Sequence, residues 1–367
     1  MKIKNDIWFN KINYQFLKRI LIIYHLLFFL IAYYNIAFNS RTSDGENFIR
    51  LALNTENWWS LFGFGTKFMA FLIYPLVKIG FNYFLLALLS SLISLKGFLI
   101  YLDLQKNALY KNKLSILVLS SFWLFLPSIH YWTSLLGKDA IIFLLMAMIL
   151  KAIKLNNFKS PWIYILLLLA FFIRPYSVFI LIASALIILV FFTHKSIKIK
   201  LCSVGIFLLL GALSLPVLIK KFLKIKEYDG IQDLIFKFFE TIQNFNSSNG
   251  SHFFDIFKTS YLEKLTILLI RPLFFDASSF FSHIASFQNS IILIILIYYL
   301  YLFLFKRKRL TKLSYKFALL TMLLFWIIIS TYIFNLGQAS RMRVMILPYL
   351  FYALSGLLIA NQKETIT

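Results

Sequence analysis

The chain of 367 residues contains a single cysteine, Cys202, and few acidic side chains. One cysteine excludes an intramolecular disulfide bond and a metal centre held by several thiolates. HExxH, Asp-x-Asp and paired Cys/His patterns are also missing, so we predict no cofactor; a divalent metal ion is left open, without a clear motif to support it. The glycine motifs that cradle nucleotide phosphates are absent too, which argues against a pump driven by its own nucleotide site.

Charged residues are scarce as well. They make up only 14% of the chain, whereas hydrophobic residues make up 60%, and the mean hydropathy is +0.80. A soluble domain of this length would carry far more charge. The apolar runs are long and continuous, without the alternation of outer-membrane strands. We therefore predict an all-α, polytopic transmembrane helical bundle that forms a single integral membrane domain over residues 1–367.

The formal net charge of +24 is unevenly distributed along the chain. The loops that we expect on the inner side are basic and poor in acids, whereas the expected outer segments mix both signs. This bias follows the positive-inside rule, and basic loops against an anionic leaflet explain the excess without nucleic acid. A basic segment precedes the first apolar run, which has no cleavage site, so we expect a signal anchor with its N-terminus inside.

Hydropathy predicts about ten crossings of the bilayer, with both termini in the cytoplasm. Residues 39–82 are expected as an outer loop with an interfacial helix near Phe68–Val77, and residues 220–289 as a second outer region. Only one charge, Lys96, is expected in the middle of a span. The short limb before Arg174 suggests that this arginine lies below the outer surface. The expected spans are approximately Ile20–Phe38, Tyr83–Leu102, Leu114–Pro127, Asp139–Ile153, Pro161–Ile173, Ser177–Phe192, Leu201–Leu218, Ile291–Phe305, Phe317–Leu336 and Val344–Ala360.

Cations stand at several expected outer helix starts. Arg174 and Arg271 each precede a proline, Lys138 precedes a helix, and Arg343 precedes the last span. A helix N-terminus is already partly positive, so a cation there is mildly unfavourable unless an anion binds both. We therefore predict a phosphate-binding outer face, the alternative being that these cations contact lipid phosphates or snorkel. The candidate residues are Arg41, Lys138, Arg174, Arg271, Arg341, Arg343 and His130, the last with an interfacial position as its alternative.

Carboxylates on the same face are candidates for a general base. Asp44 and Glu46 lie in the first outer loop, and their spacing would place them on different faces of a helix. Asp44 could instead form a turn with the following glycine. Asp139 and Asp276 are reserve candidates, although Asp139 could simply cap its helix and Asp276 could pair with Arg271. A carboxylate near an apolar boundary and close to arginines can be tuned as a base.

The order of these motifs resembles that of bacterial polysaccharide polymerases of the O-antigen polymerase type and, more broadly, of GT-C membrane glycosyltransferases. The resemblance covers about residues 41–348 and implies a polyprenyl-pyrophosphate-linked glycan donor and acceptor, with transfer on the periplasmic face of the bacterial inner membrane. Other polysaccharide-assembly membrane proteins are further implied partners. The adjacent Asp-Glu pair of metal-dependent GT-C members is missing. The motifs are Ser43–Phe48, Pro127–Ser134, Gly137–Asp139, Arg174–Pro175, Arg271–Asp276, and Arg341–Arg343 followed by Pro348.

Two other functions are also consistent with these sequence features. One is a GT-C enzyme that transfers a single sugar from a lipid-phosphate donor. The other is a flippase or transporter of lipid-linked glycans, which should carry charges along a path through the bilayer. Only Lys96 is expected in the middle of a span, and the candidate ionisable residues lie on the outer side, which favours chemistry at a surface over transport. Trp58, Trp59, Tyr131 and Trp132 could stack on sugars or anchor the chain at the interface.

Overall fold

The computed structural model describes residues 2–38, 44–110, 119–157, 160–222, 229–246, 254–255 and 258–359, and every regular element within those ranges is a helix. Six helices are long and apolar enough to cross a membrane. They indicate a helical, multi-pass membrane protein, as the sequence predicts. These helices are α1 (Lys2–Phe38), α4 (Tyr83–Tyr110), α9 (Pro175–Phe192), α13 (Phe280–Leu304), α14 (Leu313–Ser330) and α15 (Leu336–Ile359).

Eight other helices and three 3-10 turns complete the described part of the chain. They are α2 (Asp44–Leu53), α3 (Thr66–Lys78), α6 (Pro127–Thr133), α7 (Lys138–Lys154), α8 (Pro161–Ile173), α10 (Ile197–Phe222), α11 (Ile231–Asn246) and α12 (Tyr261–Ile270), with 3-10 turns η1 (Trp58–Leu61), η2 (Phe122–Phe125) and η3 (Phe274–Asp276). The helix predicted near Phe68–Val77 is confirmed as α3.

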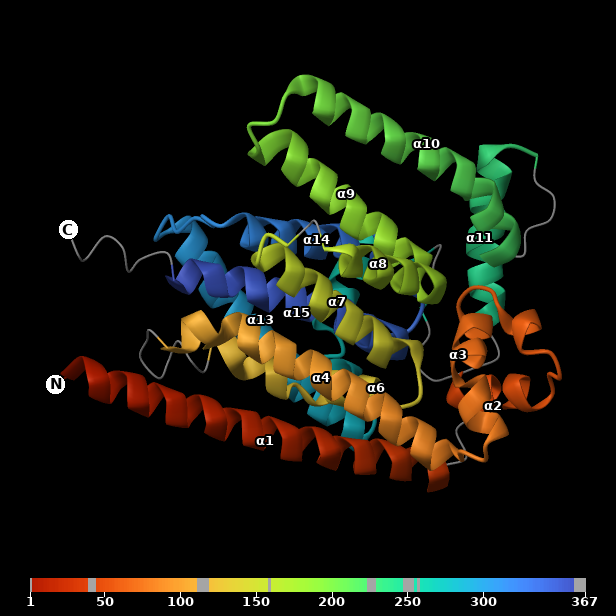
Figure 1. Cartoon of the computed structure of the whole chain (residues 1–367), viewed down its shortest axis with the longest axis horizontal. Helices are drawn as coiled ribbons and strands as arrows, with labels where there is room; N and C mark the ends of the chain where they lie inside the picture. The colour runs from red at the N-terminus through yellow and green to blue at the C-terminus, as the bar shows by residue number, and fades with distance from the viewer. Residues whose placement is uncertain are drawn as a thin grey trace.

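The helices form an elongated bundle in which the start of α1 and the end of α15 lie at the same end (Figure 1). α4 packs against α1 and α7, and α14 packs against α15 and α9. α15 is the most enclosed of the six long helices, with 83% of its apolar window buried. α2 and α3 pack against each other at the opposite end of the bundle from the start of α1.

Two segments differ from the sequence prediction. Residues 128–138 and 337–343, expected as outer turns, instead contribute α6 and the first turns of α15. The span expected at 114–127 lies partly outside the described residues, and its described part is broken between η2 and α6. Leu126 has an extended backbone there, and Pro127 begins the new helix because the first helical position needs no backbone N–H.

We expect an impermeant thiol reagent to label one end of the bundle only. Cys202 is the single cysteine and is exposed, so a Cys202→Ser background is simple to build. Cysteines at the exposed positions Glu56 and Lys258 should react in intact spheroplasts, whereas cysteines at Lys195 and Lys306 should react only after permeabilisation. Labelling of all four positions from outside would contradict the orientation inferred from the basic loops.

Candidate functional site

A buried carboxylate, Asp139, joins two arginines from distant parts of the chain. Asp139 lies in the first turn of α7 and its side chain is 2% exposed. Its Oδ1 accepts a hydrogen bond from Arg174, at the junction of α8 and α9, and its Oδ2 accepts one from Arg341 in α15. Both carboxylate oxygens are therefore occupied by guanidinium groups, and the beginnings of α7, α9 and α15 are held together.

A second carboxylate and a third cation extend this group. Arg341 also pairs with Asp44 at the start of α2, with 2.7 Å between its NH2 and Asp44 Oδ2. The Lys138 ammonium donates to Thr66 Oγ1 of α3 at 3.1 Å. We call Asp44, Lys138, Asp139, Arg174 and Arg341 the outer cluster. Three cations face two carboxylates in it, so the cluster carries a surplus positive charge.

Local backbone features bring these side chains together. Arg174 ends α8 and is the N-cap of α9, and Pro175 takes the first helical position, as predicted. Gly45 allows α2 to approach the segment before α7: a Cβ added there would lie only 2.9 Å from the Leu136 carbonyl oxygen. The close contact at Gly45 therefore places Asp44 next to the start of α7.

The accessible members of the outer cluster differ from the buried ones. The Asp44 side chain is 47% exposed and that of Arg341 is 24% exposed, whereas Arg174 is buried. Partial burial raises the pKa of Asp44, but the Arg341 guanidinium and then Lys138 and Arg174 outweigh it, so the pKa lies below its usual range. Asp44 is therefore an ionised carboxylate, open to solvent, at the edge of a cationic site.

Aromatic and polar side chains line the same cluster. The guanidinium of Arg341 lies 5.9 Å from the ring centroid of Trp132, and the ammonium of Lys138 lies 6.0 Å from that of Phe48. The NH1 of Arg174 donates to the hydroxyl of Tyr176 at 3.3 Å. These contacts fix the direction of the cationic side chains, since each is held on more than one side.

No family model, curated protein or solved structure matched the chain.

Arg271 and Asp276 form a separate group with Glu263. Arg271 Nε donates to Asp276 Oδ2 at 3.0 Å, and its NH1 donates to Glu263 Oε1 at 3.1 Å. The expectation that Arg271 precedes a helix start is wrong, because it is the C-cap of α12 and only the three-residue turn η3 follows. A cation at a helix C-terminus is favourable, so its position needs no bound anion.

Arg343 is placed in the second turn of α15, not before it, and is 1% exposed. Its NH1 donates to Asn289 Oδ1 at 2.7 Å, and its Nε donates to the Leu268 carbonyl at 2.8 Å. Its NH2 donates to the carbonyls of Ile267 and Arg271. These bonds satisfy carbonyl groups at the end of α12, which have no partner within their own helix.

His130 is fully buried in α6, and the polar contacts described for its ring are with His25 and the Leu124 carbonyl, not with the outer cluster. Its Nδ1 lies 2.8 Å from His25 Nδ1, and its ring stacks on Phe98 with centroids 4.1 Å apart. Its Nε2 faces the Leu124 carbonyl at 2.6 Å. His25 lies within the first apolar run of the sequence, and an ionisable residue at such a position is a signal that the sequence analysis missed.

The other candidate residues predicted from the sequence lie outside the outer cluster or outside the described residues. Glu46 is exposed in the first turn of α2, so it and Asp44 are on a helix and not in a loop. Arg41 lies outside the described residues. Trp58 stacks on Phe71, with centroids 5.0 Å apart, which uses one face of its ring in packing. Among the described residues, no three His, Cys, Asp or Glu side chains gather to form a metal-ion site.

Proposed function

We propose that the chain is a membrane glycosyltransferase that polymerises polyprenyl-pyrophosphate-linked oligosaccharide repeat units at the outer cluster. The observation that carries the proposal is the convergence of Lys138, Arg174 and Arg341 with the carboxylates Asp44 and Asp139 at one end of an apolar bundle. A pyrophosphate leaving group needs several cations, and an acceptor hydroxyl needs one carboxylate base. The outer cluster supplies both kinds of group.

In the proposed reaction, a hydroxyl oxygen of the acceptor sugar attacks the anomeric carbon of the donor. The bond between that carbon and the pyrophosphate oxygen breaks, and the leaving pyrophosphate takes the electron pair. Asp44 accepts the hydroxyl proton, because it is the more exposed of the two carboxylates. Asp139 is occupied by two arginines, and its role is to position them.

The three cations of the outer cluster also differ in role according to their exposure. Arg341 and Lys138 are partly exposed and contact the pyrophosphate, whereas the buried Arg174 holds Asp139 from behind. An arginine presents its donors in a planar fork that matches phosphate oxygens. Lys138, Arg174 and Arg341 stand at the start or within the first two turns of α7, α9 and α15, whose partly positive N-terminal ends add to their field.

The proposal includes a location and a topology. The chain would cross the bacterial inner membrane about ten times, with both termini in the cytoplasm and the outer cluster at the periplasmic face. α7, α8 and α10 would supply crossings beyond the six helices that are both long and apolar enough to span a membrane. The GT-C resemblance and the polysaccharide-assembly partners it implies belong to the same proposal. The polyprenyl tail would lie against the phenylalanine-rich spans.

Arg341→Lys is expected to lower the rate of polymer formation at least tenfold while the protein level stays normal. The substitution keeps the charge but loses the fork that joins Asp44, Asp139 and the pyrophosphate. Polymer length and amount on a gel of surface polysaccharide measure the effect. A ladder reduced to one repeat indicates a polymerase, whereas a ladder that is merely shifted indicates transfer of a single sugar.

The matched control is Arg50→Lys. Arg50 lies at the end of α2, is exposed, and donates only to Asn47 within its own helix among the contacts described. Its replacement should leave the polymer unchanged. Normal polymer in Arg341→Lys, or equal loss in both variants, would refute a pyrophosphate contact at Arg341.

A further inference from the structure

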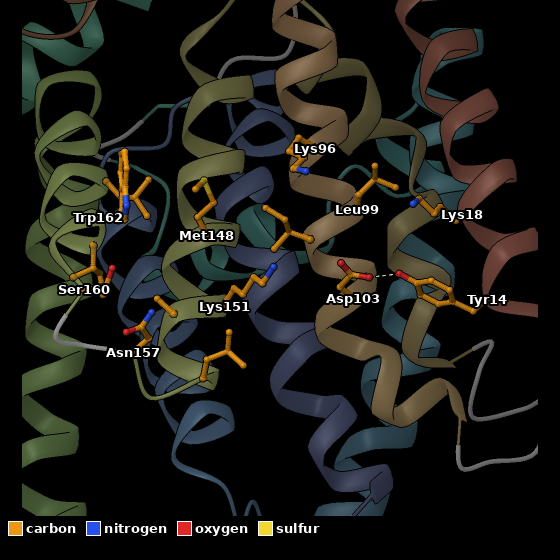
Figure 2. Close-up of a pocket in the computed structure, with 15 residues that line it drawn as sticks. Tyr14, Lys18, Lys96, Leu99, Asp103, Met148, Lys151, Asn157, Ser160 and Trp162 are labelled. Atoms are coloured by element: carbon orange, nitrogen blue, oxygen red, sulfur yellow. Dashed lines mark hydrogen bonds between the residues drawn. The ribbon is translucent and has the colours of Figure 1, made fainter. Parts of the chain in front are cut away.

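A cavity of about 460 Å³ lies between α1, α4, α7 and α8, away from the outer cluster. Figure 2 shows that Lys18 of α1, Lys96 of α4 and Lys151 of α7 surround it, with Trp162 of α8 on the far side. We call this cavity the inner cleft. The proposed reaction makes no use of it.

The inner cleft has an excess of positive charge. Within the described part of the chain, no side chain or carbonyl forms a salt bridge or hydrogen bond with the ammonium groups of Lys18, Lys96 or Lys151. The only acidic residue of the lining, Asp103, accepts a hydrogen bond from the hydroxyl of Tyr14 (Figure 2). Three cations therefore face one carboxylate that already has a partner.

Lys96 lies deep within its membrane span, where an ammonium group without a partner is unfavourable. Lys96 lies near the middle of the candidate span Tyr83–Lys106 of α4, and the predicted end of the span at Leu102 is about 9 Å away along the helix at 1.5 Å per residue. A lysine side chain is about 6 Å long, so Lys96 does not reach the interface by snorkelling along α4. An unpaired ammonium at this depth is costly, and an anion in the inner cleft would offset the cost.

The positions of Lys18 and Lys151 indicate the end of the bundle at which the inner cleft opens. Lys18 is near the beginning of the apolar window of α1, and Lys151 is in the last turn of α7. Both are at the end of the bundle that carries the basic loops. The inner cleft therefore extends from the inner interface toward the middle of the bilayer, and its opening meets the inner leaflet.

Apolar side chains border the same opening. Trp162 is 67% exposed and Leu155 is 63% exposed, and both line the inner cleft together with Leu99, Met148 and Leu166. A free inorganic anion would leave these surfaces uncovered. A lipid would place its phosphate among the lysines and its acyl chains against Trp162 and Leu155, so that both kinds of surface are satisfied.

We propose that the inner cleft binds the phosphate headgroup of an anionic phospholipid from the inner leaflet, through Lys18, Lys96 and Lys151. This inference uses the proposed orientation of the chain in the membrane. It does not depend on the glycosyltransferase proposal, because the two sites share no residue.

The test is lipid binding to the purified full-length protein, measured by native mass spectrometry. We expect phosphatidylglycerol to bind at least tenfold more tightly than phosphatidylcholine with the same acyl chains, because its headgroup carries a net negative charge whereas the choline ammonium cancels the phosphate charge and repels the lysines. Lys96→Met should remove most of this preference. Lys96→Arg keeps the charge and should retain it, which also shows that substitution at this position permits folding.

Lys195→Gln is the matched control, because Lys195 is exposed in the loop after α9 and lies outside the inner cleft. Equal binding of the two lipids to the unmodified protein would overturn the proposal. An equal loss of preference in Lys195→Gln and Lys96→Met would also overturn it, because it would indicate attraction by overall charge. Displacement of phosphatidylglycerol by millimolar inorganic phosphate would assign the cleft to a free anion and refute the lipid.

Discussion

Asp44→Asn is expected to lower the rate of polymer formation by about 10²–10⁴-fold, the contribution typical of general-base catalysis. The amide keeps the size of the side chain but accepts a proton far less readily. It also leaves Arg341 attached to Asp139, so the helices around the outer cluster stay in place. Polymer synthesis measured with a lipid-linked repeat unit, together with the protein level in the membrane, separates lost chemistry from lost folding.

Glu46→Gln is the control for this prediction. Glu46 lies in the same first turn of α2 and is exposed, whereas the salt bridges described for Arg341 are with Asp44 and Asp139. Glu46→Gln removes one negative charge from the same turn, as Asp44→Asn does, and should have little effect on polymer formation. Full polymer length in Asp44→Asn, with loss in Asp276→Asn, would move the base to the group around Arg271 and refute the assignment.

Asp139→Ala is expected to destabilise the protein by about 3–5 kcal/mol, the usual effect of removing one partner from a buried ion pair. Arg174 is buried and would keep a charge without its carboxylate, and Arg341 would keep only Asp44. Unfolding of the purified protein in mixed micelles, followed by circular dichroism, measures the change. Because α7, α9 and α15 meet at Asp139, the loss should appear as one cooperative shift.

A salt bridge at an exposed position provides the comparison. Asp233 pairs with Lys237 one turn later in α11, with 2.7 Å between charged atoms, and both side chains are accessible to solvent. Asp233→Ala should leave the unfolding midpoint nearly unchanged, since water solvates both partners. Equal midpoints for Asp139→Ala and the unmodified protein would show that Asp139 does not hold the three helices together.

The sequence predicts the helical membrane class and several helix boundaries, because both depend on local properties. Hydropathy marks the apolar runs, and the proline after Arg174 marks the start of α9. The predicted limb Pro161–Ile173 coincides with α8. The count of crossings remains a prediction, since length and composition single out six helices.

The partners of individual charges were harder to predict. The sequence indicates Asp139 only as a reserve candidate with helix capping as its alternative, yet Asp139 binds arginines 35 and 202 residues away in the chain. Contacts at such separations depend on how helices pack, and no local pattern encodes them. The same reason explains Arg343, which a local pattern places at a helix start and which instead binds the end of α12.

Arg341 and Arg343 are two residues apart on α15, and each faces a different neighbour. The first binds Asp44 and Asp139, and the second holds the Arg271 carbonyl and Asn289. A rotation of this turn of α15 would therefore strain both sets of bonds at once. One turn of α15 therefore links the outer cluster to the segment that follows α12, and a substitution that displaces this turn should disturb the contacts of both.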